Sequence, residues 1–193
     1  MSDDQRAAVQ QVFDGAADTY DAVGVSMFQP IAEQLVTDLS PRSGERALDV
    51  GCGRGAVLFR LAEAVGPTGR AIGIDLSPRM VEATAAEAAA AGLPAEVAVG
   101  DAEAPDVPDA AFELVTSSLV LFFLPDPAAA LVAWHRKLVE GGRLGVSTFG
   151  PLSDSWYDVD ATFAPYLPPG MADPRTRQAD TPFGSDEGME RLV

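Results

Sequence analysis

Three alternating glycines between an apolar segment and a helical pattern are the feature that most constrains this chain. Gly51, Gly53 and Gly55 follow the apolar segment at residues 46–50. Because glycine lacks a Cβ and readily adopts positive φ, a turn built from these residues can be tight and lets a ligand approach the backbone. Apolar residues then recur at helical spacing: Val57, Leu58, Leu61, Ala62 and Val65. We expect a strand, a glycine turn and a helix whose N-terminus lies beneath a bound ligand.

Two acids beside this turn indicate the kind of ligand. Asp75 ends the apolar segment 70–75 and lies 20 residues after Gly55, where an acid of a doubly wound fold accepts hydrogen bonds from ribose hydroxyls. Asp49 lies two residues before Gly51, and its carboxylate would repel a pyrophosphate but suits an ammonium group near a sulfonium. The glycine spacing also differs from that of dinucleotide sites. These features predict S-adenosylmethionine, which carries both cations and no phosphate.

Five segments resemble, in order, the motifs of class I S-adenosylmethionine-dependent methyltransferases: Asp49–Gly55, Gly73–Met80, Val99–Ala102, Phe112–Val120 and Leu138–Val146. They are most similar to the branch that includes the ubiquinone and menaquinone biosynthesis methyltransferases and many small-molecule methyltransferases. The resemblance covers roughly residues 10–150, and five motifs are more specific than one glycine loop. It implies an α/β fold with a Rossmann-like, doubly wound, mostly parallel sheet. It also implies direct in-line methyl transfer from S-adenosylmethionine to O, N or C of a small organic acceptor.

The apolar patterns predict the same alternation of strands and helices. Strands are expected near residues 46–50, 70–75, 95–100, 112–117 and 143–149. Helical stripes from Val9 to Tyr20 and from Phe28 to Leu39 predict an N-terminal helical extension over residues 1–40, ahead of a cofactor-binding core over 41–150.

Capping signals bound two helices of that core. Ser77 and Pro78 are typical of a helix start, and Gly92 is typical of the end of the same helix. Asp126–Pro127 and Gly141–Gly142 are expected to bracket the next helix in the same way.

Residues 151–193 are expected to form a lid or substrate cap and the start of a helix. The proline-rich and aromatic stretch that ends at Phe183 either closes an apolar acceptor pocket together with the N-terminal helices or is an ordinary connecting loop. Ser185 and the acids after it predict a helix start. The family's sheet has seven strands, so the resemblance implies that the C-terminal strands are missing here. The strand at 143–149 would then be an exposed edge, which predicts a covering segment or a homo-oligomer.

The resemblance assigns the methionyl and ribose contacts to the first two motifs. Asp49 orders the glycine loop or contacts the methionine ammonium through water, while Gly51 and Gly53 supply backbone contacts. Cys52 is a small neighbour of the ligand, and Asp75 holds the ribose hydroxyls. Without a ligand, the same residues could only shape a strand-to-helix turn, but Asp75 argues against that alternative.

The adenine and methyl-donor contacts follow from the later motifs. Leu76 and Met80 should flank the adenine, although Met80 could be plain core. Asp101 should accept from the exocyclic amine and the backbone N–H of Ala102 should meet a ring nitrogen. Residues expected at the methyl-donor end are Ser118, Leu119 and Phe122, with Tyr20 closing the pocket from the N-terminal side.

No catalytic base is identified. His135 is the only histidine, and its place late in the helix that begins at Asp126 favours a structural role. An acidic pair with an asparagine around the fourth and fifth strands, as magnesium-dependent methyltransferases use, is not found, so no metal is implied.

Composition disfavours several classes of partner. The chain has 193 residues, a net charge of −16 and one cysteine. A surface of this sign repels a phosphate backbone, which makes nucleic acid an unfavourable substrate. No apolar run could span a bilayer and the first residues lack the order of a signal peptide, so a cytoplasmic location is expected. Two alternatives remain open: a nicotinamide-dependent oxidoreductase, and a non-catalytic or repurposed S-adenosylmethionine-binding module.

Overall fold

The computed structural model describes residues 1–20, 27–150, 155, 158, 162 and 182–192. The chain divides into two compact units, Met1–Ser147 and Thr148–Val193. The helices and strands of the first unit are α1 (Asp3–Ala16), α2 (Phe28–Leu39), β1 (Arg46–Val50), α3 (Ala56–Val65), β2 (Arg70–Asp75), α4 (Pro78–Ala91), β3 (Ala95–Val99), β4 (Phe112–Ser118), η1 (Leu121–Phe123), α5 (Pro127–His135) and β5 (Leu138–Ser147). The elements of the second unit are η4 (Pro182–Gly184) and α7 (Asp186–Leu192).

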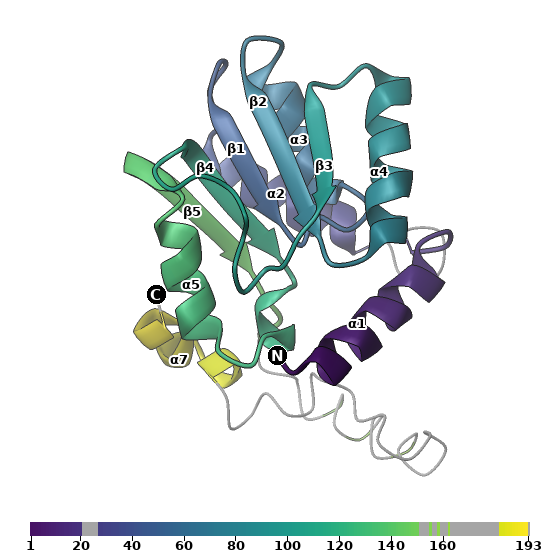
Figure 1. Cartoon of the computed structure of the whole chain (residues 1–193). Helices are drawn as coiled ribbons and strands as arrows, with labels where there is room; N and C mark the ends of the chain where they lie inside the picture. The colour runs from purple at the N-terminus through teal and green to yellow at the C-terminus, as the bar shows by residue number, and fades with distance from the viewer. Residues whose placement is uncertain (21–26, 151–154, 156–157, 159–161, 163–181, 193) are drawn as a thin grey trace. The chain divides into compact units, whose positions relative to one another are not determined.

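The first unit is built on one sheet of five parallel strands in the order β3-β2-β1-β4-β5. Figure 1 shows α2 and α3 behind this sheet and α5 in front of it. The strand order reverses between β1 and β4, and in such sheets ligands bind beyond the carboxyl ends of the strands at this reversal. The predicted Rossmann-like, doubly wound α/β fold is therefore confirmed, and the residues after β1 and β4 lie where a ligand is expected.

Helix α3 anchors the glycine turn to the core. Leu58, Leu61 and Val65 recur at helical spacing and are fully buried, as the apolar pattern of the sequence requires. They belong to one cluster with residues of α2, β1 and β2, including Ala47 and Ala71. The helix therefore cannot shift without opening the core beneath the turn that precedes it.

The predicted capping residues of α4 are confirmed. The side chain of Ser77 accepts a hydrogen bond from the backbone N–H of Met80, and Pro78 occupies the first turn, where its missing N–H costs nothing. Gly92 ends the helix in the left-handed conformation, with φ of 64°. The start of α5 is confirmed in the same way, because Asp126 accepts from the N–H of Ala129 at 2.9 Å.

The predicted boundaries between α5 and β5 are wrong. Helix α5 ends at His135, and β5 covers Leu138–Ser147 where a strand was predicted at residues 143–149. Gly141 and Gly142 thus lie inside the strand and do not end the helix. The register explains this, because Phe112 pairs with Leu138 but Leu114 pairs with Arg143, so β5 holds a bulge.

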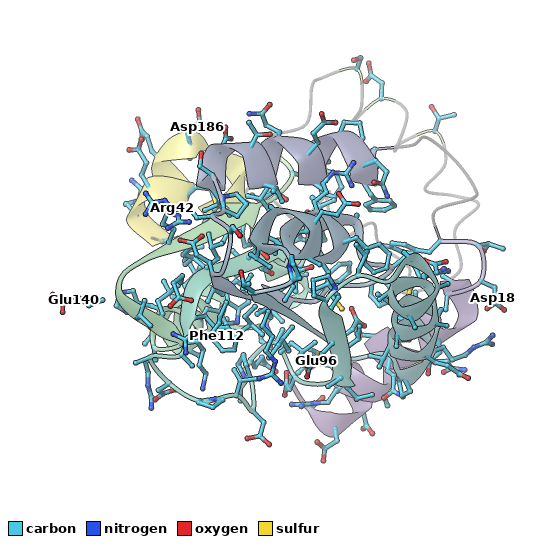
Figure 2. The ribbon with its side chains drawn as sticks, turned by 90° about the horizontal axis from the view of Figure 1, so that it is seen from above. Asp18, Arg42, Glu96, Phe112, Glu140 and Asp186 are labelled. Atoms are coloured by element: carbon cyan, nitrogen blue, oxygen red, sulfur yellow. The ribbon has the colours of Figure 1, made fainter. Side chains whose placement is uncertain are left out.

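Gly141 accommodates the bulge with a φ of 74°, a conformation that favours glycine. Its neighbour Glu140 is exposed and projects away from the sheet in Figure 2.

The first helix also ends earlier than its apolar stripe indicates. Helix α1 ends at Ala16, and Tyr20 lies in the turn that follows. The N–H and the hydroxyl of Thr19 both donate to the carbonyl of Ala16, which satisfies that carbonyl outside a helix. Strand β3 ends at Val99, one residue before the predicted end.

The described part of the second unit contains the helix start that the sequence predicts. The side chain of Ser185 accepts from the N–H of Gly188 at 3.1 Å, immediately before α7. The predicted lid at 151–183 lies almost entirely outside the described residues, and so its role stays a prediction. Within the described part of the chain, no helix is both long and apolar enough to cross a membrane.

Truncation of Leu58 tests the role of α3 in the core. Leu58→Ala removes a fully buried side chain, and we expect the free energy of unfolding to fall by about 2–5 kcal/mol. The matched control is Val132→Ala on α5, which removes a side chain that is 63% exposed and should cost about 0.5 kcal/mol or less. Chemical denaturation measures both changes. Equal costs for the two variants would contradict this description of the core.

Candidate functional site

The glycine loop, residues 51–55, is fixed against β2 and the turn after β4. Gly51, Gly53 and Gly55 have φ of 71°, 48° and 82°, which confirms that the loop needs glycine. The N–H groups of Gly51 and Cys52 both donate to the carbonyl of Ile74, at 2.8 and 3.0 Å. A Cβ on Gly51 would lie 2.4 Å from Cγ2 of Val120. The loop is therefore held from both sides.

Asp75 ties the glycine loop to the start of α4. One carboxylate oxygen accepts from the N–H of Gly53 at 2.8 Å and the other from the N–H of Ser77 at 2.9 Å. The hydroxyl of Thr84, on α4, donates to the carbonyl of Gly53 at 2.7 Å and fixes the loop from the same helix. Burial raises the pKa of Asp75, although its two backbone donors act in the opposite direction.

Asp49 is a buried acid at the end of β1. Its side chain accepts a hydrogen bond of 2.8 Å from the hydroxyl of Thr116 on β4, and the residue is only 2% exposed. Burial raises the pKa of Asp49 to about 7, and the nearby charge of Asp75 acts in the same direction. A cation placed beside this carboxyl would therefore favour its ionisation.

Burial also raises the pKa of the Cys52 thiol, with the carboxylates of Asp49 and Asp75 as further causes. A thiol in this setting is a small neutral side chain and a poor nucleophile. That Cys52 is a neighbour of the ligand stays a prediction.

A cavity of about 690 Å³ lies beside the glycine loop. This volume includes the part of the cavity that is open to solvent. Ten of the predicted site residues line it: Tyr20, Gly51, Gly53, Asp75, Leu76, Met80, Asp101, Ala102, Ser118 and Leu119. A second cavity, of about 440 Å³, shares five of these residues and adds the remaining predicted neighbours of the methionyl group, Asp49 and Cys52.

Phe122 is the exception among the predicted residues. It lines neither cavity, whereas the next residue, Phe123, lines the larger one. Both belong to the short helix η1, and their rings lie 4.6 Å apart. The sequence alone does not fix the residue at which this three-residue helix begins. A start shifted by one residue would exchange the positions of the Phe122 and Phe123 side chains.

Sequence reasoning missed the part of the cavity that α1 and the strand ends supply. Val9 and Phe13 of α1 line the larger cavity, as do Gly100, Val120 and Leu124. Val9 and Phe13 are one helical turn apart, and this spacing predicts that they share an apolar face of the helix. It does not predict that this face covers the cavity. His135 ends α5 and lines neither cavity.

Aromatic rings from three elements and a turn gather at the end of the cavity near Tyr20. Tyr20 stacks on Phe28 of α2 with ring centroids 4.8 Å apart, and Phe13 contacts Tyr20 at 6.0 Å. Phe13 also meets Phe123 edge to face at 5.5 Å. These contacts are typical of aromatic packing, and they join α1, α2 and η1 around the cavity.

The loop after β3 is held by contacts from two helices. The indole N–H of the buried Trp134, on α5, donates to the carbonyl of Ala102 at 2.7 Å. Asp101 accepts from the N–H of Glu103 at 2.9 Å and forms an ion pair with Arg6 of α1. The sequence did not predict this ion pair. Asp101 and Ala102 thus line the cavity on a segment that both helices hold.

Replacement of Asp49 tests its raised pKa. The folded protein holds the proton up to about pH 7, whereas an unfolded aspartate loses it near about pH 4. Because the folded state binds more protons between these values, the contribution of Asp49 to the free energy of unfolding falls as the pH rises through this window. Asp49→Asn cannot ionise, so its stability relative to the wild type should rise over the same window. Chemical denaturation without ligand measures the difference.

Asp109→Asn is the control for that series. Lys137 and Arg136 lower the pKa of Asp109, so this substitution should lose stability relative to the wild type as the pH rises through the low range where Asp109 ionises. A difference between wild type and Asp49→Asn that does not change with pH would contradict the raised pKa.

Known proteins match this chain over the sheet and the glycine loop. The family model described as a methyltransferase domain matches residues 47–142. Nocamycin O-methyltransferase of Saccharothrix syringae is 47% identical over 142 residues, which are 73% of this chain and 50% of that protein. The chain thus spans about half the length of this relative. Aklanonic acid methyltransferase DauC of Streptomyces sp. (strain C5) is 40% identical over 164 residues, or 84% of this chain and 74% of that protein.

A solved structure agrees at the level of the fold. A SAM-dependent methyltransferase from Aquifex aeolicus superposes with a TM-score of 0.56 at 19% identity, covering 83% of this chain and 86% of the other. None of these matches supports a nicotinamide-dependent oxidoreductase or a repurposed binding module. From the family model and the relatives together, we conclude that the chain belongs to the family of S-adenosylmethionine-dependent methyltransferases.

Proposed function

We propose that this chain binds S-adenosylmethionine in the larger cavity and transfers its methyl group to an oxygen of a small organic acceptor. The observation that carries the proposal is the position of Asp75, at the end of β2, bonded to the glycine loop and lining the cavity. The choice of oxygen rests on the relative named nocamycin O-methyltransferase. A cytoplasmic location and a homo-oligomer accompany the proposal as predictions.

The ribose would be held by Asp75. Each of its carboxylate oxygens accepts one backbone N–H, from Gly53 and Ser77, and an ionised carboxylate offers about four acceptor positions. Positions therefore remain for the two ribose hydroxyls. The existing bonds fix the carboxylate before the ligand arrives, so little ordering is required when it binds.

The adenine would lie between the start of α4 and the loop after β3. Leu76 and Met80 line the cavity on one side, and Asp101 and Ala102 line it from the other segment. Asp101 would accept from the exocyclic amine, and the N–H of Ala102 would donate to a ring nitrogen. The hydrogen bond from Trp134 to the carbonyl of Ala102 holds this segment in place.

The methionyl group would extend along the glycine loop toward the smaller cavity. Gly51 and Gly53 have no side chain to obstruct it, and Asp49 and Cys52 line that cavity. An ammonium group near Asp49 would compensate the burial that raises its pKa. Binding of the cofactor should thus convert Asp49 from a half-protonated acid at neutral pH to a carboxylate.

Methyl transfer would occur where the two cavities share residues, at Tyr20, Ser118 and Leu119. A lone pair of the acceptor oxygen forms the new bond to the methyl carbon, while the bond from carbon to sulfur breaks and its electrons stay on sulfur. The acceptor proton leaves to solvent or a base, and S-adenosylhomocysteine is released. Alignment and exclusion of water would be the main contribution of the protein, up to ~7–11 kcal/mol in well-oriented systems.

Calorimetric titration with S-adenosylhomocysteine tests the cofactor site. We expect micromolar binding to the wild type and at least ~10-fold weaker binding to Asp75→Asn, because charged acceptors for the ribose hydroxyls are lost. Asp38→Asn is the matched control, since Asp38 is exposed on α2 and lines neither cavity. Binding of NAD without binding of S-adenosylhomocysteine would reject the proposal.

Turnover tests the second half of the proposal. The chain is incubated with methyl-labelled S-adenosylmethionine and a panel of phenols, enols and carboxylic acids, and the label is followed into product by mass spectrometry. We expect labelled methyl ethers or esters, and a lower kcat/KM for Asp75→Asn that follows its weaker cofactor binding. Tight cofactor binding with transfer to the carbon of an enol, and to no oxygen, would correct the acceptor atom.

A further inference from the structure

Helix α1 covers the cofactor cavity without being part of the core. None of its residues is buried, and Val12 is 66% exposed, yet Val9 and Phe13 line the cavity. Figure 1 shows α1 beside the start of α4, on the side of the sheet where the strands end. A helix with so little buried surface needs polar contacts to hold it there.

The C-terminal end of α1 is tied to the segment that holds the ribose site. The carboxylate of Asp14 accepts from the hydroxyl of Ser77 and, at 3.4 Å, from the N–H of Arg79. Asp18, just after the helix, forms an ion pair of 2.7 Å with Arg79. The guanidinium of Arg54, in the glycine loop, donates to the carbonyl of Ala17.

Two cationic groups at the N-terminal end of α1 contact the adenine segment: the ammonium of Met1, which donates to both carboxylate oxygens of Glu103 at 2.9 and 2.8 Å, and the guanidinium of Arg6. Arg6 pairs with Asp101 and lies 3.7 Å from the carboxylate of Glu103. All three side chains are partly buried, with exposures of 33%, 23% and 21%. The Nε of Arg6 is buried and has no hydrogen-bond partner among the described residues.

Arg6 therefore contacts the same carboxylate that is proposed to read the adenine. Asp101 uses one oxygen for the N–H of Glu103 and the other for Arg6. Acceptor positions remain on both oxygens for an exocyclic amine. Without the guanidinium, Asp101 would lose its ion pair and one of the two groups that orient it, whereas Glu103 would keep the Met1 ammonium.

We infer that Arg6 is a positioning residue for adenine recognition, which couples the closure of α1 over the cavity to the reading of the exocyclic amine by Asp101. The inference rests on the proposed function. Closure brings Arg6 to Asp101, and the oriented carboxylate then accepts from the amine. In a purine with a carbonyl in place of that amine, the carbonyl oxygen faces the carboxylate. Two acceptors form no hydrogen bond, so the affinity of this purine gains nothing from the orientation of Asp101.

The test compares two ligands and three variants. S-adenosylhomocysteine carries the amine, and S-inosylhomocysteine carries a carbonyl at the same position. Arg6→Met keeps most of the side-chain length without the charge, whereas Arg6→Lys keeps the charge. Arg70→Met is the control, because Arg70 forms a more exposed ion pair with Glu96, on the neighbouring strand, and lines neither cavity.

We expect Arg6→Met to raise the Kd of S-adenosylhomocysteine by about 3- to 10-fold and the Kd of S-inosylhomocysteine by less than about 2-fold. Arg6→Lys should restore most of the difference, and Arg70→Met should change neither Kd. Added salt should weaken S-adenosylhomocysteine binding more in the wild type than in Arg6→Met, because the ion pair is screened. Calorimetry measures each Kd, and circular dichroism confirms that the variants keep their helices.

Two results would overturn the inference. An equal rise in the Kd of both ligands in Arg6→Met would mean that the helix acts only as a cover. Unchanged Kd values would mean that the ion pair does not contribute to binding. Failure of the wild type itself to bind S-adenosylhomocysteine would reject the proposed function and this inference with it. The wild-type titration therefore separates the two failures.

Discussion

The hydrogen bond from the N–H of Gly53 to the carboxylate of Asp75 joins the two segments on which the site depends. The glycine loop follows β1 and Asp75 ends β2, so this one bond fixes the distance between the parts of the cavity that are proposed to hold the methionyl group and the ribose. The loop can make it because positive φ turns its N–H groups toward β2. The core beneath, through Leu58 of α3, holds the loop in that position.

Two neighbouring carboxyls, the buried Asp49 and the partly buried Asp75, give the site its electrostatic character. Burial raises the pKa of both Asp49 and Asp75, and their mutual repulsion raises that of Asp49 further. A ligand with a sulfonium and an ammonium group supplies the positive charge that would relieve this repulsion. The burial and proximity that disfavour two ionised carboxylates thus favour a cationic ligand.

Helix α1, which covers the cavity, makes polar contacts that α3, beneath the glycine loop, does not need. Helix α3 is held by buried side chains, whereas α1 is held by the ring contacts of Phe13 and by ion pairs and hydrogen bonds to the segments around Ser77 and Asp101. Polar contacts of partly exposed groups are individually weak and are screened by salt. Such contacts can break and form without disturbing the core, and the inferred coupling between closure of α1 and the loop that is proposed to read the adenine depends on this property.

The sequence by itself determined the alternation of strands and helices, the glycine loop, the caps at Ser77 and Asp126, and ten of the residues that line the larger cavity. These depend on local properties: φ preference, capping chemistry and apolar spacing. Only the tertiary structure decided the bulge at Gly141, the choice of Phe123 over Phe122, and the ion pair of Arg6 with Asp101. The bulge and the ion pair join residues distant in sequence, so they depend on strand register and on how α1 packs. The choice of Phe123 depends on the phase of a short helix. A local pattern specifies none of these.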